Sequence, residues 1–276
     1  RTGSNFLNLL RQASFNGLIA FGMTCVILSD GIDLSVGSTF ALSAIICAEL
    51  MIHGIPAAAA ILIALLAGTA LGMVSGVLVT KGRLQPFIAT LITMTAYRGL
   101  ALIITDGKPV SRLAASVKNE SSAFLFKVLG KGSFVFGPND MISIPIPAII
   151  LILFLLVFYF VLHHTTFGRR IYATGSNEKC AKLVGVNTTK IRIAVYSISG
   201  FMSALAGLIM ISRVDSAQPT LGEGYELDAI AAVALGGTSM SGGRGTVLGA
   251  LLGSLILATI AKALPLIPFF NQLWLN

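Results

Sequence analysis

Long apolar runs separated by short polar connections fill the chain from end to end. A helix needs ~20 predominantly apolar residues to cross the hydrocarbon core of a bilayer. The runs that approach or reach this length are residues 13–29, 36–52, 55–80, 84–104, 141–162, 193–212 and 247–264. A further apolar segment, 227–239, is shorter and is a candidate re-entrant segment. The pattern predicts an all-α fold, a polytopic transmembrane helical bundle.

The composition agrees with this prediction. The 276 residues are 55% hydrophobic and only 11% charged, with a mean hydropathy of +0.88, far from the composition of ordinary soluble domains. Because apolar segments recur throughout, residues 1–276 are expected to form a single transmembrane domain, with 105–140 as the long exterior connection. The chain begins with Arg1 and shows no cleavable signal peptide. The missing initiating Met suggests a fragment.

The positive charge is concentrated in one loop, 163–192. Short loops rich in Lys and Arg stay in the cytoplasm, so this loop is predicted to lie inside the cell and the first residue outside. The loop 105–140 is also basic, which argues mildly against this topology. The net charge of +8 therefore indicates membrane orientation, and a nucleic-acid partner is not expected. The cations of the inner loop are Arg169, Arg170, Lys179, Lys182, Lys190 and Arg192.

The stretch 167–185 within this loop has the signals of a short helix. Ser176 or Asn177 is placed to cap its start, and Glu178 suits the positive helix end. Gly185 stands where a left-handed C-terminal cap is needed, with Val186 placed for the accompanying apolar contact. Such a short helix is not stable alone, so the flanking chain or a partner must hold it.

A second polar stretch, 29–38, inserts two carboxylates and three hydroxyls between apolar runs. Asp33 or Ser35 is a candidate cap for the helix that follows, and Gly31 and Gly37 allow a bend and close backbone approach. One interpretation is a capped turn at the inner membrane face. The other is a broken helix that lines a polar path, because carboxylates at membrane depth usually mark substrate or ion routes.

A related pattern returns at 224–236. When Gly31 is aligned with Gly224, Asp33 faces Glu226, and the following Leu and Ala positions also match. Five predicted spans separate the two copies, an odd number that places them on opposite sides of the bilayer. This is the pattern of an inverted-topology repeat, found in many transporters.

Glycines at four-residue spacing predict close helix packing, at 68, 72 and 76 and again at 245, 249 and 253. The glycine-rich run 236–246 lacks the Gly-Lys-Ser/Thr ending of a phosphate-binding loop. No cofactor is therefore predicted, and any ATP must be bound by another chain. The adjacent His163 and His164 and the three unpaired-looking cysteines do not have the spacing of a metal site.

Three stretches together, 31–38, 167–186 and 234–246, resemble the permease subunits of bacterial ABC sugar importers, the group that contains the ribose, xylose and arabinose permeases. The resemblance covers almost the whole chain and implies a multi-pass protein of the bacterial inner membrane. In that family a coupling helix in the cytoplasmic loop docks on a separate ATP-binding subunit. Matched by position, the contact residues here are Gly168, Arg169, Asn177, Glu178, Ala181, Leu183 and Gly185.

The resemblance also implies an external solute-binding protein, surrounding membrane lipid, and a second permease copy or a sister permease. Family members usually have a further membrane segment before Arg1 and another after Asn276, which favours truncation at both ends. They more often have glycine at the position of Asp30, so the extra carboxylate weakens any inherited substrate assignment. Relatives carry nucleosides, branched-chain amino acids or a sugar-like signalling molecule as well as sugars.

A transient polar cavity for a pentose-like or hexose-like sugar is expected between two parts of the bundle. The candidates for its lining or its gates are Asp33, Ser35, Ser38, Thr39, Glu226 and Asp228. One alternative is a secondary transporter driven by protons or sodium, with Asp30 and Asp33 as coupling carboxylates. Another is a membrane-embedded enzyme that uses His163, His164 or Asp33, although no base, nucleophile or metal constellation supports it.

Overall fold

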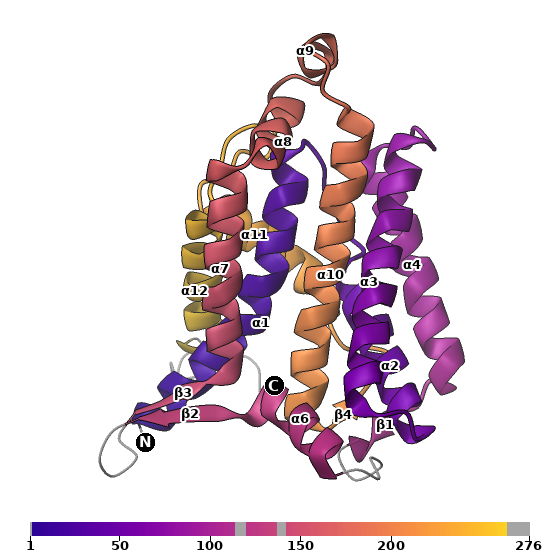
Figure 1. The fold of residues 1–276 in the computed structure, drawn as a ribbon, viewed down its shortest axis with the longest axis vertical. Coiled ribbons are helices and arrows are strands. Elements are labelled where there is room, and N and C mark those ends of the chain that lie inside the picture. Colours follow the sequence, from indigo (N-terminus) through magenta and orange to yellow (C-terminus); the bar gives the residue numbers. More distant parts are fainter. Residues whose placement is uncertain (1, 114–119, 137–141, 264–276) are drawn as a thin grey trace, which may run out of the picture.

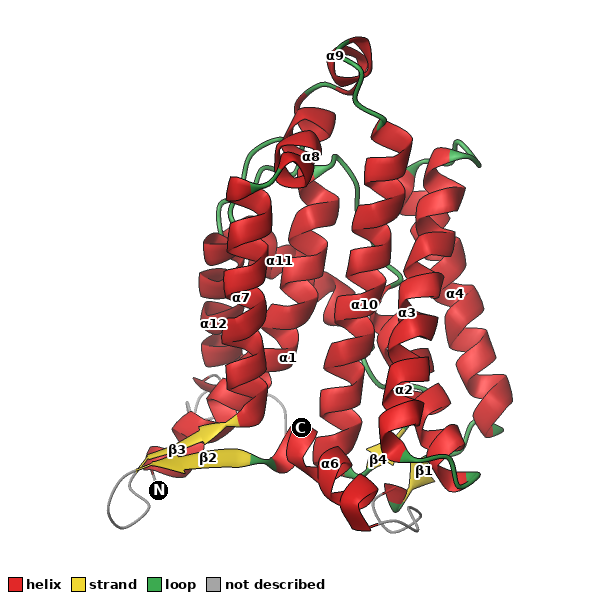
Figure 2. Cartoon of the chain, viewed as in Figure 1, coloured by secondary structure: helices red, strands yellow, loops and turns green. Residues whose placement is uncertain are grey.

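The computed structural model describes residues 2–113, 120–136 and 142–263 (Figure 1). Helices run roughly parallel through the bundle, and the strands are short and lie at one end (Figure 2). The elements are α1 Thr2–Leu28, α2 Val36–Ile52, α3 Ala57–Thr80, α4 Pro86–Thr105, β1 Val110–Ser111, α6 Glu120–Lys131, β2 Ser133–Phe136, β3 Ile142–Pro145, α7 Ile146–His164, α8 Thr166–Ser176, α9 Glu178–Leu183, α10 Thr188–Val214, β4 Ser216–Ala217, α11 Tyr225–Leu235 and α12 Val247–Ala263.

The predicted all-α bundle is confirmed. Within the described ranges, α3, α4, α7 and α10 are long and apolar enough to cross a membrane, while α2 and α12 are shorter apolar helices. In the part of the chain that the structure describes, the strands form two antiparallel pairs, β1 with β4 and β2 with β3. Strand β2 lies in the predicted exterior connection 105–140, whereas β3 occupies the start of the predicted span 141–162, so that α7 begins only at Ile146.

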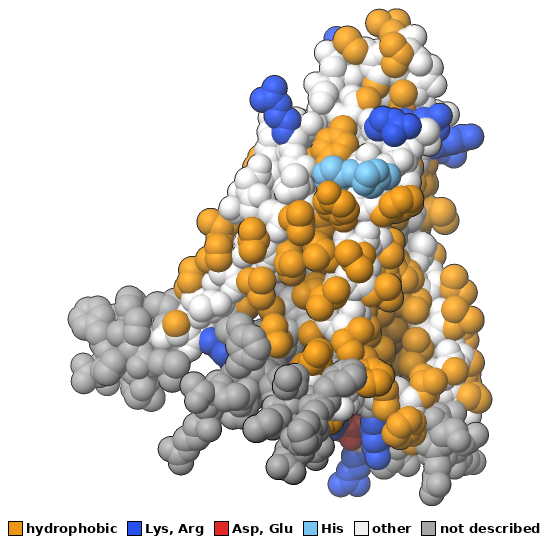
Figure 3. All heavy atoms as spheres, turned by 60° about the vertical axis from the view of Figure 1, so that its left-hand side comes forward, with side chains coloured by type: hydrophobic (Ala, Val, Ile, Leu, Met, Phe, Trp, Pro, Cys, Tyr) orange, Lys and Arg blue, Asp and Glu red, His pale blue; other side chains and the backbone are white. Residues whose placement is uncertain are grey.

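The two ends of the bundle differ in character. We call them the α9 end, which carries α8 and α9, and the α6 end, which carries α6 and the strands (Figure 1). Seen from the side, a broad apolar surface covers the middle of the bundle, and histidine, lysine and arginine side chains lie above it towards the α9 end (Figure 3). This is the distribution of a protein whose middle faces lipid.

Helix α10 is central to the packing, and α3 lies directly against it through the predicted glycine stripe. A Cβ atom built on Gly72 would meet Gly200 and the carbonyl of Tyr196, and one on Gly76 would meet Ile193. Helices whose backbones touch in this way require glycine at the contact, because a side chain would not fit. The prediction of close packing by this stripe is confirmed.

The second stripe is confirmed in part. Gly249 and Gly253 on α12 lie against the backbone of Gly236 and Ala232 at α11, whereas Gly245 lies in the preceding loop.

Two helices begin only after an irregular stretch of chain, and the two stretches enter from opposite ends. Residues 29–35 lead from the α9 end into α2, and residues 218–224 lead from β4 at the α6 end into α11 (Figure 1). The loop after α11 reaches the α9 end, where the N–H of Gly243 donates to the carbonyl of Leu28 at 3.0 Å. Segment 227–239 is therefore not re-entrant, because α11 and its flanking chain continue to the other end.

The opposite entries are those that the inverted repeat requires. The proposed residue pairing is shifted, however. Helix α2 begins five residues after Gly31, whereas α11 begins one residue after Gly224. The architecture follows the prediction, and the sequence alignment differs from the helix starts by about one turn.

Candidate functional site

The polar segment between α7 and α10 contains α9, a helix of six residues. Its N-cap is Asn177, whose side-chain oxygen accepts a hydrogen bond from the backbone N–H of Cys180 at 3.0 Å. Ser176, the other candidate, is the last residue of α8. Glu178 lies in the first turn, where the positive helix end stabilises a carboxylate. The predicted helix start is confirmed, with Asn177 as the cap.

The other end of α9 closes with a left-handed glycine, Gly185, at φ +84°. Its N–H donates to the carbonyl of Lys182 at 3.1 Å, and the N–H of Val186 donates to the carbonyl of Ala181 at 3.0 Å. These two bonds form the Schellman arrangement, which satisfies carbonyls that a helix end leaves unpaired. The predicted glycine cap is confirmed.

Glu178 fastens α9 to the rest of the chain. Its carboxylate lies 2.7 Å from Nζ of Lys182 on the same helix and 3.1 Å from Nη2 of Arg192 on α10. It also accepts a hydrogen bond from the hydroxyl of Thr188 at 3.2 Å. The hydrogen bond from Lys182, followed by the charge of Arg192, holds the pKa of Glu178 below its ordinary value. The carboxylate is therefore charged at neutral pH.

The tip of α9 presents apolar side chains to the surroundings. Leu183 is 86% exposed and Val184 78% exposed, whereas Ala181 is buried at 3%. Exposed leucine and valine side chains at the end of a projecting helix form a surface that a partner can cover. Val184 is a member of this surface that the sequence reasoning missed, although it directly follows the predicted residue Leu183.

Two of the residues matched to the coupling contact are internal. Gly168 lies in the tight corner between α7 and α8, where a Cβ atom would meet the carbonyls of Val161 and Leu162. Ala181 packs towards the protein's own chain. Arg169 is exposed on α8. The predicted set therefore divides into residues that shape the segment and residues that a partner can touch.

Helix α8 was not predicted, because its sequence is polar and short. Thr165 caps it by accepting a hydrogen bond from the N–H of Gly168 at 3.2 Å. The hydroxyl of Tyr172 donates to the carbonyl of Gly245 at 2.9 Å. The glycine-rich run 236–246, which lacks the ending of a phosphate-binding loop, thus contacts α8 through its backbone.

The break between α1 and α2 centres on the buried carboxylate of Asp33. Its Oδ1 accepts hydrogen bonds from the N–H of Ser35 at 3.0 Å and from the hydroxyl of Ser35 at 2.6 Å. Its Oδ2 accepts from the hydroxyl of Ser199 on α10 at 2.8 Å. Neither predicted cap bonds to the first turn of α2: Ser35 is the N-cap residue but its side chain makes no capping hydrogen bond, and within this segment Asp33 accepts only from Ser35, before the helix begins.

Further polar contacts extend this network into α3 and α4. The hydroxyl of Ser35 lies 3.3 Å from that of Ser75, which donates to the hydroxyl of Thr93 at 3.1 Å. The carbonyl of Ile32 accepts from the hydroxyl of Tyr196 on α10 at 3.2 Å. Because the buried side chains of Asp33, Ser35, Ser75 and Tyr196 all have hydrogen-bond partners, the break is a defined structure.

The first turns of α2 and α11 meet inside the bundle. A Cβ atom on Gly37 would meet the carbonyl of Gly222 and the carboxylate of Glu226. The rings of Phe40 and Tyr225 are in edge contact, with centroids 5.3 Å apart. Glu226 is buried, and its carboxylate accepts from the N–H of Gly224 at 3.3 Å. Two half-helix N-termini with nearby carboxylates therefore cross here.

The remaining candidates for the substrate path lie in different surroundings. Ser38 is buried, and its hydroxyl donates to the carbonyl of Ser35 at 2.9 Å. The hydroxyl of Thr39 is buried with no hydrogen-bond partner among the described residues. Asp228 is exposed on α11. The structure thus brings Asp33, Ser35 and Ser38 together and places Asp228 apart, and their role in a path stays a prediction.

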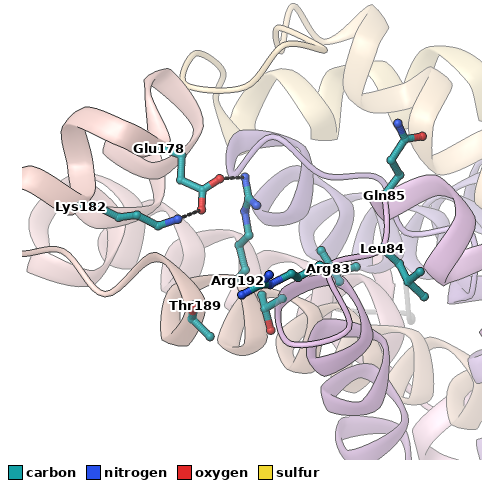
Figure 4. A pocket seen from close by; sticks show the side chains of 9 residues that line it. Arg83, Leu84, Gln85, Glu178, Lys182, Thr189 and Arg192 are labelled. Carbon is teal, nitrogen blue, oxygen red and sulfur yellow. Dashed lines mark ion pairs between the residues drawn. The ribbon is translucent and has the colours of Figure 1, made fainter.

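A polar cavity of about 360 Å³ lies beside α9 (Figure 4). It is bounded by the turn between α3 and α4, by α9 and by the start of α10. Arg83 contributes a third cation next to Lys182 and Arg192, while Glu178 is the carboxylate that bridges the latter two (Figure 4). The ion pairs that hold α9 are therefore open to solvent and to an approaching partner.

Arg98 on α4 holds the other irregular stretch. Its guanidinium donates to the carbonyl of Leu221 at 2.8 Å and to the carbonyl of Pro219. No sequence signal indicated this contact, because the partners are more than a hundred residues away. The chain that leads into α11 is thereby anchored to α4.

The metal and enzyme alternatives gain no support. His163 and His164 are exposed at the end of α7, and a nitrogen of His163 lies 3.0 Å from the carbonyl of Tyr159 in the same helix. Within the described ranges no three His, Cys, Asp or Glu side chains cluster as a metal site would require.

Residues 5–275 match the family described as "Branched-chain amino acid transport system / permease component". The chain is 50% identical to the ribose import permease protein RbsC of Bacillus subtilis, over 95% of this chain and 77% of the relative. It is 45% identical to RbsC of Escherichia coli K12, over 96% and 79%. It is 36% identical to the xylose transport system permease protein XylH of the same strain, over 97% and 80%. No solved structure matches.

Proposed function

We propose that this chain, which belongs to the family of branched-chain amino acid transport system permease components, carries a sugar of the ribose and xylose class. The chain is the multi-pass membrane subunit of an ABC importer. The observation that carries this proposal is 50% identity to a ribose import permease over 95% of the chain. The family description names amino acids, but the relatives reported above are named for pentoses.

A sugar needs such a protein. Moving each hydroxyl into hydrocarbon without a partner costs ~4–8 kcal/mol on the cyclohexane scale. The crossing of α2 and α11 offers buried hydroxyls and carboxylates, which are the groups that bind a polyol. We assign the substrate path to this region, and the residues nearest to the path are Asp33, Thr39 and Glu226.

The permease works with other chains. An ATP-binding subunit supplies the energy and docks on the tip of α9, through Leu183 and Val184. A solute-binding protein delivers the sugar at the α6 end, so the α9 end faces the cytoplasm. A second permease copy or a sister permease completes the pore. On docking, an apolar side chain that becomes fully buried contributes about 1.5–3 kcal/mol.

Uptake into proteoliposomes tests the cargo. The permease is reconstituted with the ATP-binding subunit and binding protein encoded beside it, and uptake of labelled D-ribose, D-xylose and L-leucine is measured with ATP inside. We expect ATP-dependent uptake of a pentose that an ionophore does not affect. Uptake of leucine alone would contradict the substrate assignment, and uptake that follows an ion gradient without ATP would support the secondary transporter.

Co-purification tests the docking surface. Leu183→Asp should release the ATP-binding subunit, whereas Val135→Asp should retain it. Val135 is the matched control because it is also an exposed apolar residue, on β2 at the α6 end. If both variants retain the subunit, α9 is not the docking element.

Thiol labelling tests the orientation. Among the cysteines, Cys180 on α9 is exposed, whereas Cys25 and Cys47 are buried. A membrane-impermeant maleimide should label Cys180 in inside-out vesicles and leave it unlabelled in cells with an intact inner membrane. Labelling from the outside only would invert the proposed topology.

A further inference from the structure

We propose that Arg192 is a positioning residue that connects α9 to the break between α1 and α2, through two carboxylates. The proposal rests on the proposed function, because it explains how a partner on α9 reaches the substrate path. One nitrogen of Arg192, Nη2, lies 3.1 Å from the carboxylate of Glu178 and 4.0 Å from the carboxylate of Asp30. The guanidinium thus stands between the docking helix and Asp30, the second residue of the break.

The surroundings make Arg192 suited to this task. Its side chain is only 16% exposed, and its Nε is buried with no partner among the described residues. A planar guanidinium carries several donors in a fixed arrangement and keeps its charge, so it can hold two carboxylates at once. Moving Glu178 away would leave a largely buried cation with one distant carboxylate, and the guanidinium would have to follow.

Asp30, the second partner of Arg192, has a backbone conformation that few residue types adopt. Asp30 takes φ +62°, the left-handed region that glycine adopts freely and aspartate tolerates. Its carboxylate pairs with Arg192.

Two further contacts follow along the same face of α10. One turn after Arg192, the hydroxyl of Tyr196 donates to the carbonyl of Ile32. Nearly one turn later, the hydroxyl of Ser199 donates to the carboxylate of Asp33. Residues at this spacing share one helix face. The break is therefore fastened to α10 at three successive points, and Arg192 is the point nearest α9.

The connection has a direction that a transport cycle can use. Helix α9 is joined to α10 by the short chain 184–187, and Glu178 adds a side-chain bond from α9 to Arg192. A displacement of α9 by a docked partner thus reaches Asp30 through Arg192 and reaches Asp33 through the α10 face. Coupling between sites can be carried by contiguous hydrogen bonds and ion pairs, which these residues supply.

The test compares sugar moved per ATP hydrolysed in the reconstituted importer. Asp30→Asn removes the contact to the break, and Arg192→Gln removes both contacts. We expect the ATP-binding subunit to stay bound and basal hydrolysis to continue, while sugar moved per ATP falls by about 5-fold or more, the lower range of coupling between distant sites. Lys190→Gln is the matched control, since it removes an exposed cation from the same turn of α10.

Two further variants separate positioning from general damage. Arg192→Lys should recover part of the ratio, because it restores the charge without the fork that reaches both carboxylates. Adding Asp30→Asn to Arg192→Gln should cost nothing more, since the first contact is already lost. Should Arg192→Gln fail to fold, Asp30→Asn still decides, because Asp30 is 57% exposed and tolerates an amide.

The outcomes are distinct from those for the proposed function. An unchanged ratio in Asp30→Asn, or an equal loss in Lys190→Gln, overturns the role of Arg192. If ATP-driven uptake is found for L-leucine and not for a pentose, the substrate assignment fails, and the same ratio is then measured with leucine. Loss of the ATP-binding subunit from Asp30→Asn would also overturn the proposal, because it would make Asp30 part of the docking surface.

Discussion

The seam between α3 and α10 gives a sharp prediction for the substitution Gly72→Ala. A Cβ atom there would meet the carbonyl of Tyr196 and would lie 3.0 Å from both Cα and N of Gly200. These are backbone atoms on the facing helix, so no side-chain rotation relieves the contact. The two helices must separate along the seam.

The matched control is Gly99→Ala on α4. A Cβ atom at Gly99 has nothing within 4 Å, so the added methyl group meets no neighbour. Both substitutions replace glycine by alanine within a helix, which favours the helix by ~1 kcal/mol if the denatured state is not helical. This contribution is the same for both variants and cancels in the comparison. Overpacking costs typically ~1–3 kcal/mol. Gly72→Ala should therefore be less stable than Gly99→Ala by that amount.

The assay is an unfolding titration of the two purified variants in detergent micelles with SDS. A difference of ~1–3 kcal/mol corresponds to roughly 5-fold to 150-fold in the unfolding equilibrium constant, since 1.4 kcal/mol is tenfold. Equal midpoints for the two variants would refute the reasoning, because the seam would then have room for a methyl group.

Three other predictions concern the break, the docking helix and the crossing. Asp33→Ala leaves buried donors without an acceptor and should destabilise the protein by about 1–3 kcal/mol, whereas Asp33→Asn should cost less in the same titration. Pairing lowers the pKa of Glu178, so the carboxylate stabilises α9 fully when the pH is above its ordinary pKa of 4.5, and this stabilisation is lost as the pH falls through the lowered pKa. A spin label on Cys180 should become mobile only in that low pH range. In Lys182→Gln the label should become mobile at a higher pH. Gly37→Ala should push α2 and α11 apart and reduce sugar uptake more than binding of the ATP-binding subunit; equal loss of both would contradict it.

Local signals were enough to predict the long apolar helices and the caps of α9. Apolar runs fix where chain enters lipid, and a capping side chain bonds within three residues of itself, as Asn177 does. The glycine stripe at 68, 72 and 76 was likewise readable, since spacing alone puts small residues on one face. These features depend on neighbours in the sequence, and the structure confirms them.

Contacts between segments that are distant in the sequence could not be predicted from it. Asp33 meets Ser199 across 166 positions, and Arg98 meets Leu221 across 123. No periodicity encodes such a pairing, because it depends on how whole helices cross. For the same reason the sequence did not show that Ala181 faces inward while Val184 faces outward, and the alignment of the two half-helices was one turn away from their observed starts.

The glycine seams also indicate which parts of the permease move together. Helices in backbone contact resist sliding because there are no flexible side chains between them. The seam of α3 with α10 and the seam of α12 with α11 therefore define two units, and α9 continues into the first of them. The units meet where Gly37 approaches Gly222, and because this is one point of backbone contact rather than a stripe of several, we expect relative movement at the crossing of the half-helices. Distances between spin labels should stay constant within each seam and change across the crossing when nucleotide binds; a change within a seam would contradict the division.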